Sequence, residues 1–92
     1  MNSINILHSH SYSKDDAFVK AEKMLEELAD KYGLEVEHDG EGHISFSGSG
    51  ITGTVAIEHN EVHFTATLSF LMIAMKSVIS SEIKRKLDNI FD

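Results

Sequence analysis

Histidine is the residue of this chain best suited to chemistry, because imidazole can ligate a metal ion or transfer a proton near neutral pH. The chain has six histidines in 92 residues. His8 and His10 are two positions apart and so share a strand face, while His43 and His63 are expected on the outer face of a sheet. A zinc site needs three or four ligands, and no third ligand stands at a diagnostic spacing. The sequence predicts no metal site and leaves the role of these four histidines open.

The other residues that could do chemistry form no known catalytic arrangement. Cysteine is absent, which excludes a thiolate nucleophile, a thiolate metal site and a disulfide. The segment Ser47-Gly48-Ser49-Gly50 lacks the Lys and Ser/Thr that complete a phosphate-binding P-loop, and it is predicted to be a hairpin turn. No serine lies in a nucleophile-elbow context, and the acidic residues are dispersed. We therefore expect no enzyme activity, no catalytic residue and no cofactor.

Net charge and hydropathy limit the kinds of partner that we expect this chain to bind. With 8 basic and 15 acidic residues the formal charge is −7, whereas sequence-independent nucleic-acid binding needs Lys and Arg to release counterions from phosphates. The basic cluster Lys84-Arg85-Lys86 is predicted to complement the dipole of a helix carboxyl end. The longest apolar run, Phe70 to Met75, is six residues long, where a membrane-spanning helix needs about 20. We expect neither a nucleic-acid partner nor a membrane span.

These residues are predicted to belong to one domain, residues 1–92, that opens with a strand and a helix. Ile4, Ile6 and His8 alternate with their neighbours as in a short strand. An amphipathic helix follows, with Ser13 as its N-cap and Gly33 just beyond its end. Its apolar positions fall on one face: Phe18, Ala21, Leu25, Leu28, Ala29 and Tyr32. The opening residues lack the features of a secretory signal, so a cytoplasmic location is expected.

The residues after this helix are predicted to form four antiparallel strands. A two-residue turn at His59-Asn60 makes every pair on one face apolar or small and matches threonines on the other face. The inner pairs are Ile57 with Val62, Val55 with Phe64, Gly53 with Ala66, and Ile51 with Leu68. A second turn, at Gly48-Ser49, sets Phe46 opposite Ile51 and Ile44 opposite Gly53. A loop at residues 40–42 sets His38 opposite Ile44 and Val36 opposite Phe46.

Gly53 stands in the middle of a predicted strand, at the centre of the inner face. Glycine weakens a strand, so we expect a large side chain or a helix backbone to press close at this position. A ligand slot between sheet and helices is the alternative.

The chain is predicted to end in a helix from about Phe70 to Ile90. One apolar stripe should face the sheet: Met72, Met75, Ile79, Ile83, Leu87 and Ile90. Further apolar residues project from the other side of the first turns and exceed what a two-layer domain can bury: Phe70, Leu71, Ile73, Ala74 and Val78. Lys76 lies within the apolar arc, and its stem is expected to cover the core from the edge. We predict that these six residues form an interaction patch.

Three segments of the carboxyl half, Ser49–Val55, Leu68–Lys76 and Glu82–Asp88, resemble the polyhydroxyalkanoic acid system protein family. The family pattern is a Ser-Gly-hydrophobic-x-Gly strand start, a Leu-Gly-Phe-Leu-Leu-Gly-Ala-Phe-Lys-like helix entry and a Glu-Ile…Asn-Leu-Asp-like end. This chain departs from it at four positions, where Ser69, Ile73, Met75 and Lys86 replace Gly, Gly, Phe and Asn. The resemblance implies a small accessory protein of polyester storage granules with no catalytic activity.

The fold predicted from the elements is a two-layer α+β domain of order β-α-β-β-β-β-α, with both helices on one face of an antiparallel sheet. The first strand is free to lie parallel to a strand of the meander. Three functions remain open. The patch contacts a polyhydroxyalkanoate granule or a granule protein, it closes a homodimer, or a cavity near Gly53 carries a small molecule.

Overall fold

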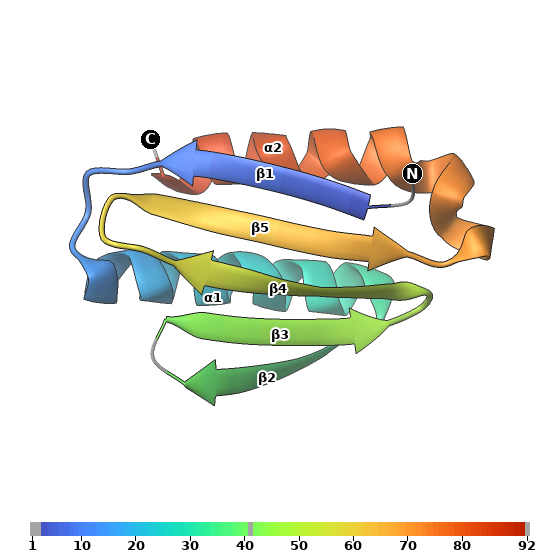
Figure 1. Ribbon diagram of the computed structural model, residues 1–92, viewed down its shortest axis with the longest axis horizontal. Helices are drawn as coiled ribbons and strands as arrows, with labels where there is room; N and C mark the ends of the chain where they lie inside the picture. The colour runs from blue at the N-terminus through green and yellow to red at the C-terminus, as the bar shows by residue number, and fades with distance from the viewer. Residues whose placement is uncertain (1–2, 41, 92) are drawn as a thin grey trace.

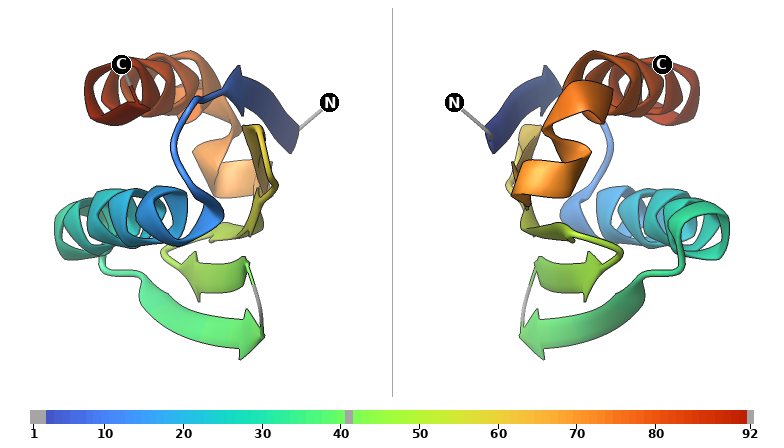
Figure 2. Two further views of the ribbon diagram at one scale, coloured as in Figure 1. Left: turned by 90° about the vertical axis from the view of Figure 1, so that its left-hand side faces the viewer. Right: turned by 90° about the vertical axis from the view of Figure 1, so that its right-hand side faces the viewer.

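The computed structural model describes residues 3–40 and 42–91. Within these residues five strands and two α-helices follow the predicted order, with a 3₁₀ helix before the last α-helix. The elements are β1 (Ser3–Ser9), α1 (Lys14–Tyr32), β2 (Glu35–Gly40), β3 (His43–Gly48), β4 (Ile51–Ile57), β5 (Glu61–Leu68), η1 (Phe70–Met75) and α2 (Lys76–Phe91). The strands form one antiparallel sheet of order β1-β5-β4-β3-β2 (Figure 1). Both helices lie on one face of it (Figure 2), which confirms the predicted α+β class.

Helix α1 begins and ends at the predicted caps. The Ser13 Oγ accepts a hydrogen bond from the Asp16 N–H at 3.1 Å, and Gly33 adopts a left-handed φ of 70° while its N–H donates to the Ala29 carbonyl. Such caps satisfy backbone groups that the helix leaves unpaired. The buried face is Ala17, Ala21, Met24, Leu25 and Leu28. Ala17 and Met24 are buried although the sequence pattern did not place them on this face, whereas Phe18, Ala29 and Tyr32, which it did place there, are half-buried.

The predicted register is confirmed at two of the three hairpins. Across β4 and β5, Val55 pairs with Phe64 and Gly53 with Ala66, as the turn at His59-Asn60 requires. Across β2 and β3, Val36 pairs with Phe46. Glu41, in the predicted loop between them, lies outside the described residues.

The predicted register of the β3–β4 hairpin was wrong by two residues. The turn centres on Ser49 and Gly50, not on Gly48 and Ser49, so that Phe46 lies opposite Gly53 and Ile44 opposite Val55. Ser49 has a φ of 52° and Gly50 a φ of 82°, and two successive positive values define the turn that best matches the twist of a hairpin. A shift of two leaves every side chain on its predicted face.

Gly53 meets a large side chain, as predicted. A Cβ atom at this position would lie 2.6 Å from Cζ of Phe46 and 2.9 Å from Cα of Ala66, and it would also collide with the Thr65 carbonyl oxygen. The Phe46 ring in turn stacks on Phe64 with 5.3 Å between centroids. The absent side chain of Gly53 therefore makes room for Phe46 in the core.

Strand β1 is an antiparallel edge strand beside β5, so the parallel placement that the sequence allowed is not adopted. Ile4 pairs with Ala66 and Ile6 with Phe64, which places both isoleucines in the core. The chain then crosses the helical face through α1 and reaches the opposite edge of the sheet at β2 (Figure 1).

The single carboxyl-terminal helix predicted from Phe70 to Ile90 is instead two helices, η1 and α2. Their axes are not collinear (Figure 2), so one helical wheel does not describe both. In α2 the predicted stripe is confirmed at Ile79, Ile83 and Leu87, which are buried. In η1 it was partly wrong, because Met72 is half-buried but Met75 is 41% exposed.

Glu82 of α2 is a buried carboxylate that ties the two helices together. Its Oε2 accepts a hydrogen bond from Lys31 Nζ at 2.7 Å, and its Oε1 accepts one from Tyr32 Oη at 2.6 Å. The Lys31 and Tyr32 hydrogen bonds hold the pKa of Glu82 below its ordinary value. Burial, with the hydrogen bond to Glu82, raises the pKa of Tyr32 to about 12.

Replacing Glu82 with Gln should destabilise the fold more at neutral pH than at acid pH. Because folding lowers the pKa of Glu82, the ionised carboxylate stabilises the fold fully above the unfolded-state pKa of 4.5. This stabilisation is lost as pH falls through the lower pKa of the folded state. Removing this charged partner should cost about 1–3 kcal/mol of unfolding free energy at pH 7. Urea denaturation at pH 7 and pH 3 should show a gap in unfolding free energy between E82Q and wild type that is smaller at pH 3. Equal stability at pH 7 would contradict this account, and the exposed Glu26→Gln serves as control.

Candidate contact surface

The apolar surface of the protein is formed by η1 and the first turn of α2. It consists of exposed apolar side chains on consecutive turns: Phe70, Leu71, Ile73, Ala74, Met75 and Val78. The side chains of Phe70 and Leu71 are almost fully in solvent, at 87% and 86% exposure. Lys76, which the sequence grouped with them, is half-buried at the start of α2. Met75 is the one member that the sequence pattern placed in the core stripe and not on this surface.

Backbone hydrogen bonds and close packing fix η1 against the end of the sheet. The Ser69 N–H donates to the Gly50 carbonyl at 2.7 Å, and the Met72 N–H donates to the Ser69 carbonyl at 2.9 Å. A Cβ atom on Gly50 would lie 2.5 Å from Ser69 Oγ and 2.8 Å from Met72 Cγ. The left-handed φ of Gly50 and these close approaches both favour glycine at position 50. Met72 is the inward anchor, which leaves Phe70 and Leu71 directed away from the core.

Helix η1 consists of apolar residues alone. Its six residues are Phe-Leu-Met-Ile-Ala-Met, with no charged or hydroxyl side chain among them, in a chain whose net charge is −7. Singly exposed apolar residues are common, whereas a contiguous exposed patch marks a site of contact with a protein, a membrane or another apolar phase. A 3₁₀ helix longer than about four residues is also uncommon. This run of exposed apolar residues in η1 is therefore the feature that requires a functional explanation.

His8 and His10 both contribute to the packing of the fold. His10 is buried, its Nδ1 accepts a hydrogen bond from the Tyr12 N–H at 3.1 Å, and its Nε2 lies 3.1 Å from the Glu58 carbonyl oxygen. His8 lies on the same side, and both rings pack on Phe91, with centroids 6.0 and 5.7 Å away. The pair thus anchors the end of α2 to β1.

His43 and His63 project from the outer face of the sheet, as predicted, on either side of Ala56. The Nε2 of His63 is 2.5 Å from Asn5 Oδ1, which links β5 to β1. In the described part of the chain no three His, Asp or Glu side chains are grouped so that they could hold a metal ion.

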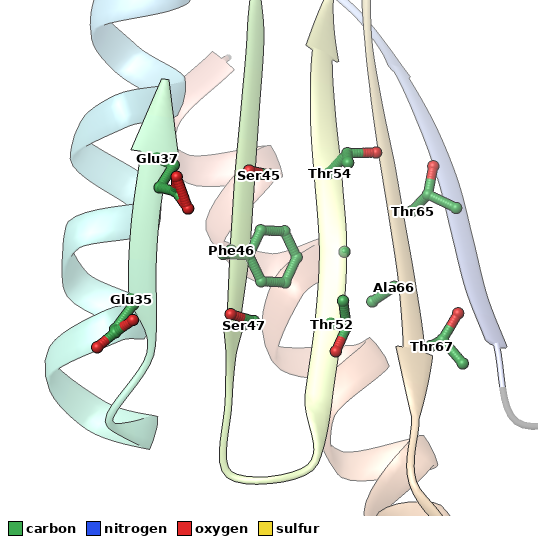
Figure 3. Close-up of a pocket in the computed structure, with 11 residues that line it drawn as sticks. Glu35, Glu37, Ser45, Phe46, Ser47, Thr52, Thr54, Thr65, Ala66 and Thr67 are labelled. Atoms are coloured by element: carbon green, nitrogen blue, oxygen red, sulfur yellow. The ribbon is translucent and has the colours of Figure 1, made fainter. Parts of the chain in front are cut away.

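A shallow hollow of about 400 Å³ lies on the outer face of the sheet. Figure 3 shows its rim of hydroxyl and carboxylate side chains, which come from neighbouring strands: Glu35, Glu37, Ser45, Ser47, Thr52, Thr54, Thr65 and Thr67. Gly53, Phe46 and Ala66 line it as well. The threonines are direct cross-strand partners, Thr52 with Thr67 and Thr54 with Thr65, an arrangement typical of a solvated antiparallel face.

The space between sheet and helices does not support the carrier hypothesis. A gap of about 10 Å³ lies there, lined by apolar residues such as Leu28, Phe46, Phe64 and Ile83. A single water molecule needs about this volume, so a larger ligand does not fit in this conformation. Gly53 accommodates Phe46, not a ligand.

None of the helices in the described residues has both the length and the hydropathy required to span a bilayer.

Comparisons with known proteins place the chain in one family. No curated protein and no solved structure gave a significant match. A family model described as that of the polyhydroxyalkanoic acid system protein matches residues 4–91.

Proposed function

The chain belongs to the polyhydroxyalkanoic acid system protein family, and from this premise we propose that it is a non-enzymatic accessory protein that binds polyhydroxyalkanoate granules through its apolar surface. The observation that carries the proposal is the near-complete exposure of Phe70 and Leu71 in a charge-free helix. The family match over residues 4–91 includes all of η1, and the family's description names polyhydroxyalkanoic acid, which is the polymer that we propose this surface contacts.

An aliphatic polyester suits this surface chemically. Such a polymer offers alkyl groups and uncharged ester groups, so adhesion to it depends on removing apolar side chains from water and not on ion pairs. The apolar surface has the matching composition, because its six members carry no charge. The acidic remainder of the domain stays hydrated and keeps bound copies from precipitating on one another.

A binding role without catalysis fits the residues that could have done chemistry. Both ring nitrogens of His10 are engaged with backbone groups, and Glu82 and Tyr32 hydrogen-bond to each other between the helices. These groups serve the fold. Because storage granules form inside the cell, the proposal also places the protein in the cytoplasm.

The proposal is tested by the partition of the purified chain onto particles of amorphous polyhydroxybutyrate. We expect the wild type to pellet with the particles and to stay bound in high salt, because apolar adhesion is not screened as ion pairing is. If the chain stays in the supernatant with bare particles and pellets only with granules isolated from cells, its partner is a granule protein and not the polymer.

A further inference from the structure

The two edges of the sheet differ in their protection. Edge strand β2 carries Glu35, Glu37 and Asp39, and its register shifts between His38 and Gly40. Charges and bulges of this kind keep an edge from pairing with another chain. Edge strand β1, the uppermost strand in Figure 1, has the sequence Ser-Ile-Asn-Ile-Leu-His-Ser, without Asp, Glu, Lys, Arg, Pro or Gly. It also pairs with β5 without a register shift.

The direction of the β1 backbone groups follows from one hydrogen bond. The His10 N–H donates to the Asn60 carbonyl at 2.9 Å and extends the β1–β5 ladder beyond the pair of Ser9 with Glu61. In an antiparallel strand the N–H and C=O of one residue point to the same neighbour, and residues alternate. The even-numbered residues of β1 therefore direct their backbone N–H and C=O groups to β5. The odd-numbered residues direct their N–H and C=O groups to the open edge: Ser3, Asn5, Leu7 and Ser9.

The side chains along this edge are also suited to pairing. Ile4 and Ile6 point into the core, whereas Leu7 is 60% exposed on the outer face. Leu7 stands beside an otherwise polar face whose threonines lie on β4 and β5. An exposed leucine next to an unprotected edge is a feature that natural sheets normally avoid, so a partner strand is expected there.

We propose that β1 pairs with β1 of a second copy, antiparallel and about a two-fold axis at Ile6, so that the two sheets become one. This register sets Asn5 opposite Leu7 of the partner subunit and Ser3 opposite Ser9 of the partner subunit. Only odd-numbered residues then exchange edge hydrogen bonds, and each side chain keeps its face. The two Leu7 side chains become diagonal neighbours. No like charges meet along β1, although each copy has a net charge of −7.

The Leu7→Pro variant separates pairing from folding. Proline lacks the N–H that Leu7 directs to the open edge, while the hydrogen bonds from β1 to β5 come from even-numbered residues and are kept. Sedimentation equilibrium at high micromolar concentration should give wild type twice the chain mass of 10.2 kDa and L7P that mass once, with the same circular dichroism. Leu7→Lys, which brings two ammonium groups together, should likewise be monomeric, while the matched control Val19→Lys on α1 should stay dimeric.

Cysteine cross-linking tests the register itself, because the chain has no native cysteine. Opposed residues of a hydrogen-bonded pair have Cα atoms about 5.5 Å apart, within the range of a disulfide. A mixture of Asn5→Cys and Leu7→Cys chains should form the mixed disulfide dimer faster than either chain alone. A monomeric wild type, or loss of the dimer in Phe70→Asp, would overturn the proposal. Because no polyester is present, this outcome is independent of granule binding.

Discussion

Replacing both Phe70 and Leu71 with Asp is expected to lower the binding constant for polyhydroxybutyrate particles by roughly two to four orders of magnitude. Burying one Phe or Leu side chain is worth about 1.5–3 kcal/mol, so the pair contributes about 3–6 kcal/mol, and each 1.4 kcal/mol is a factor of about ten. Both side chains are almost fully in solvent, so the domain should keep its fold. The measurement is co-sedimentation over a series of particle concentrations.

A control of equal charge separates the loss of apolar contact from repulsion. Val19 of α1 and Asn89 of α2 are both exposed and lie outside the apolar surface. The double variant Val19→Asp, Asn89→Asp adds the same two negative charges and should bind as wild type does. If both double variants lose binding equally, general charge and not η1 governs adhesion. If F70D/L71D binds normally, the apolar surface is not the contact.

Replacing Gly53 with Val should unfold the domain or destabilise it by about 3 kcal/mol or more, at the upper end of what overpacking a core costs. The new Cβ would collide with Phe46 and with the backbone of β5 at Thr65 and Ala66. A backbone neighbour cannot move aside as the end of a flexible side chain can. Urea denaturation followed by circular dichroism gives the unfolding free energy.

A matched substitution on the same strand shows whether position 53 is special. Thr52 lies on the outer face, where it pairs with Thr67, and Thr52→Val introduces the same side chain next to Gly53. We expect less than about 1 kcal/mol of change there, because a β-branched residue fits a half-exposed strand. Wild-type stability in G53V would show that the core has unfilled room at this point and would restore the carrier hypothesis.

Local patterns were enough to predict most of the fold. The turn at His59-Asn60 left one register that placed Val55 opposite Phe64 on the inner face, and a slip of one residue would have exposed that face. The Ser47-Gly48-Ser49-Gly50 segment was different, because either of two centres for the turn keeps the faces unchanged. Backbone φ values at Ser49 and Gly50 decide between them, and Gly50 lies against Ser69 and Met72, a long-range contact that a local pattern does not encode.

The contact surface was also predicted in outline from a local sequence pattern. An excess of apolar residues at Phe70 and Leu71 is visible in sequence, because neither belongs to the stripe that covers the sheet. The placement of Met75 was not predictable by a wheel of 100° per residue, since η1 is a 3₁₀ helix whose axis departs from that of α2. The position of β1 depended on pairing over more than fifty residues, Ile4 with Ala66, which local patterns do not encode.

The most direct test of the contact places a fluorophore on the apolar surface. The chain has no tryptophan, so Phe70→Trp adds one indole at a position of η1 that is 87% exposed. On addition of polyhydroxybutyrate particles its emission should shift to the blue as the ring leaves water, while Val19→Trp on α1 should keep the spectrum of a solvated indole. Particle-bound F70W with an unshifted emission, or a shift in V19W alone, would contradict attachment through η1.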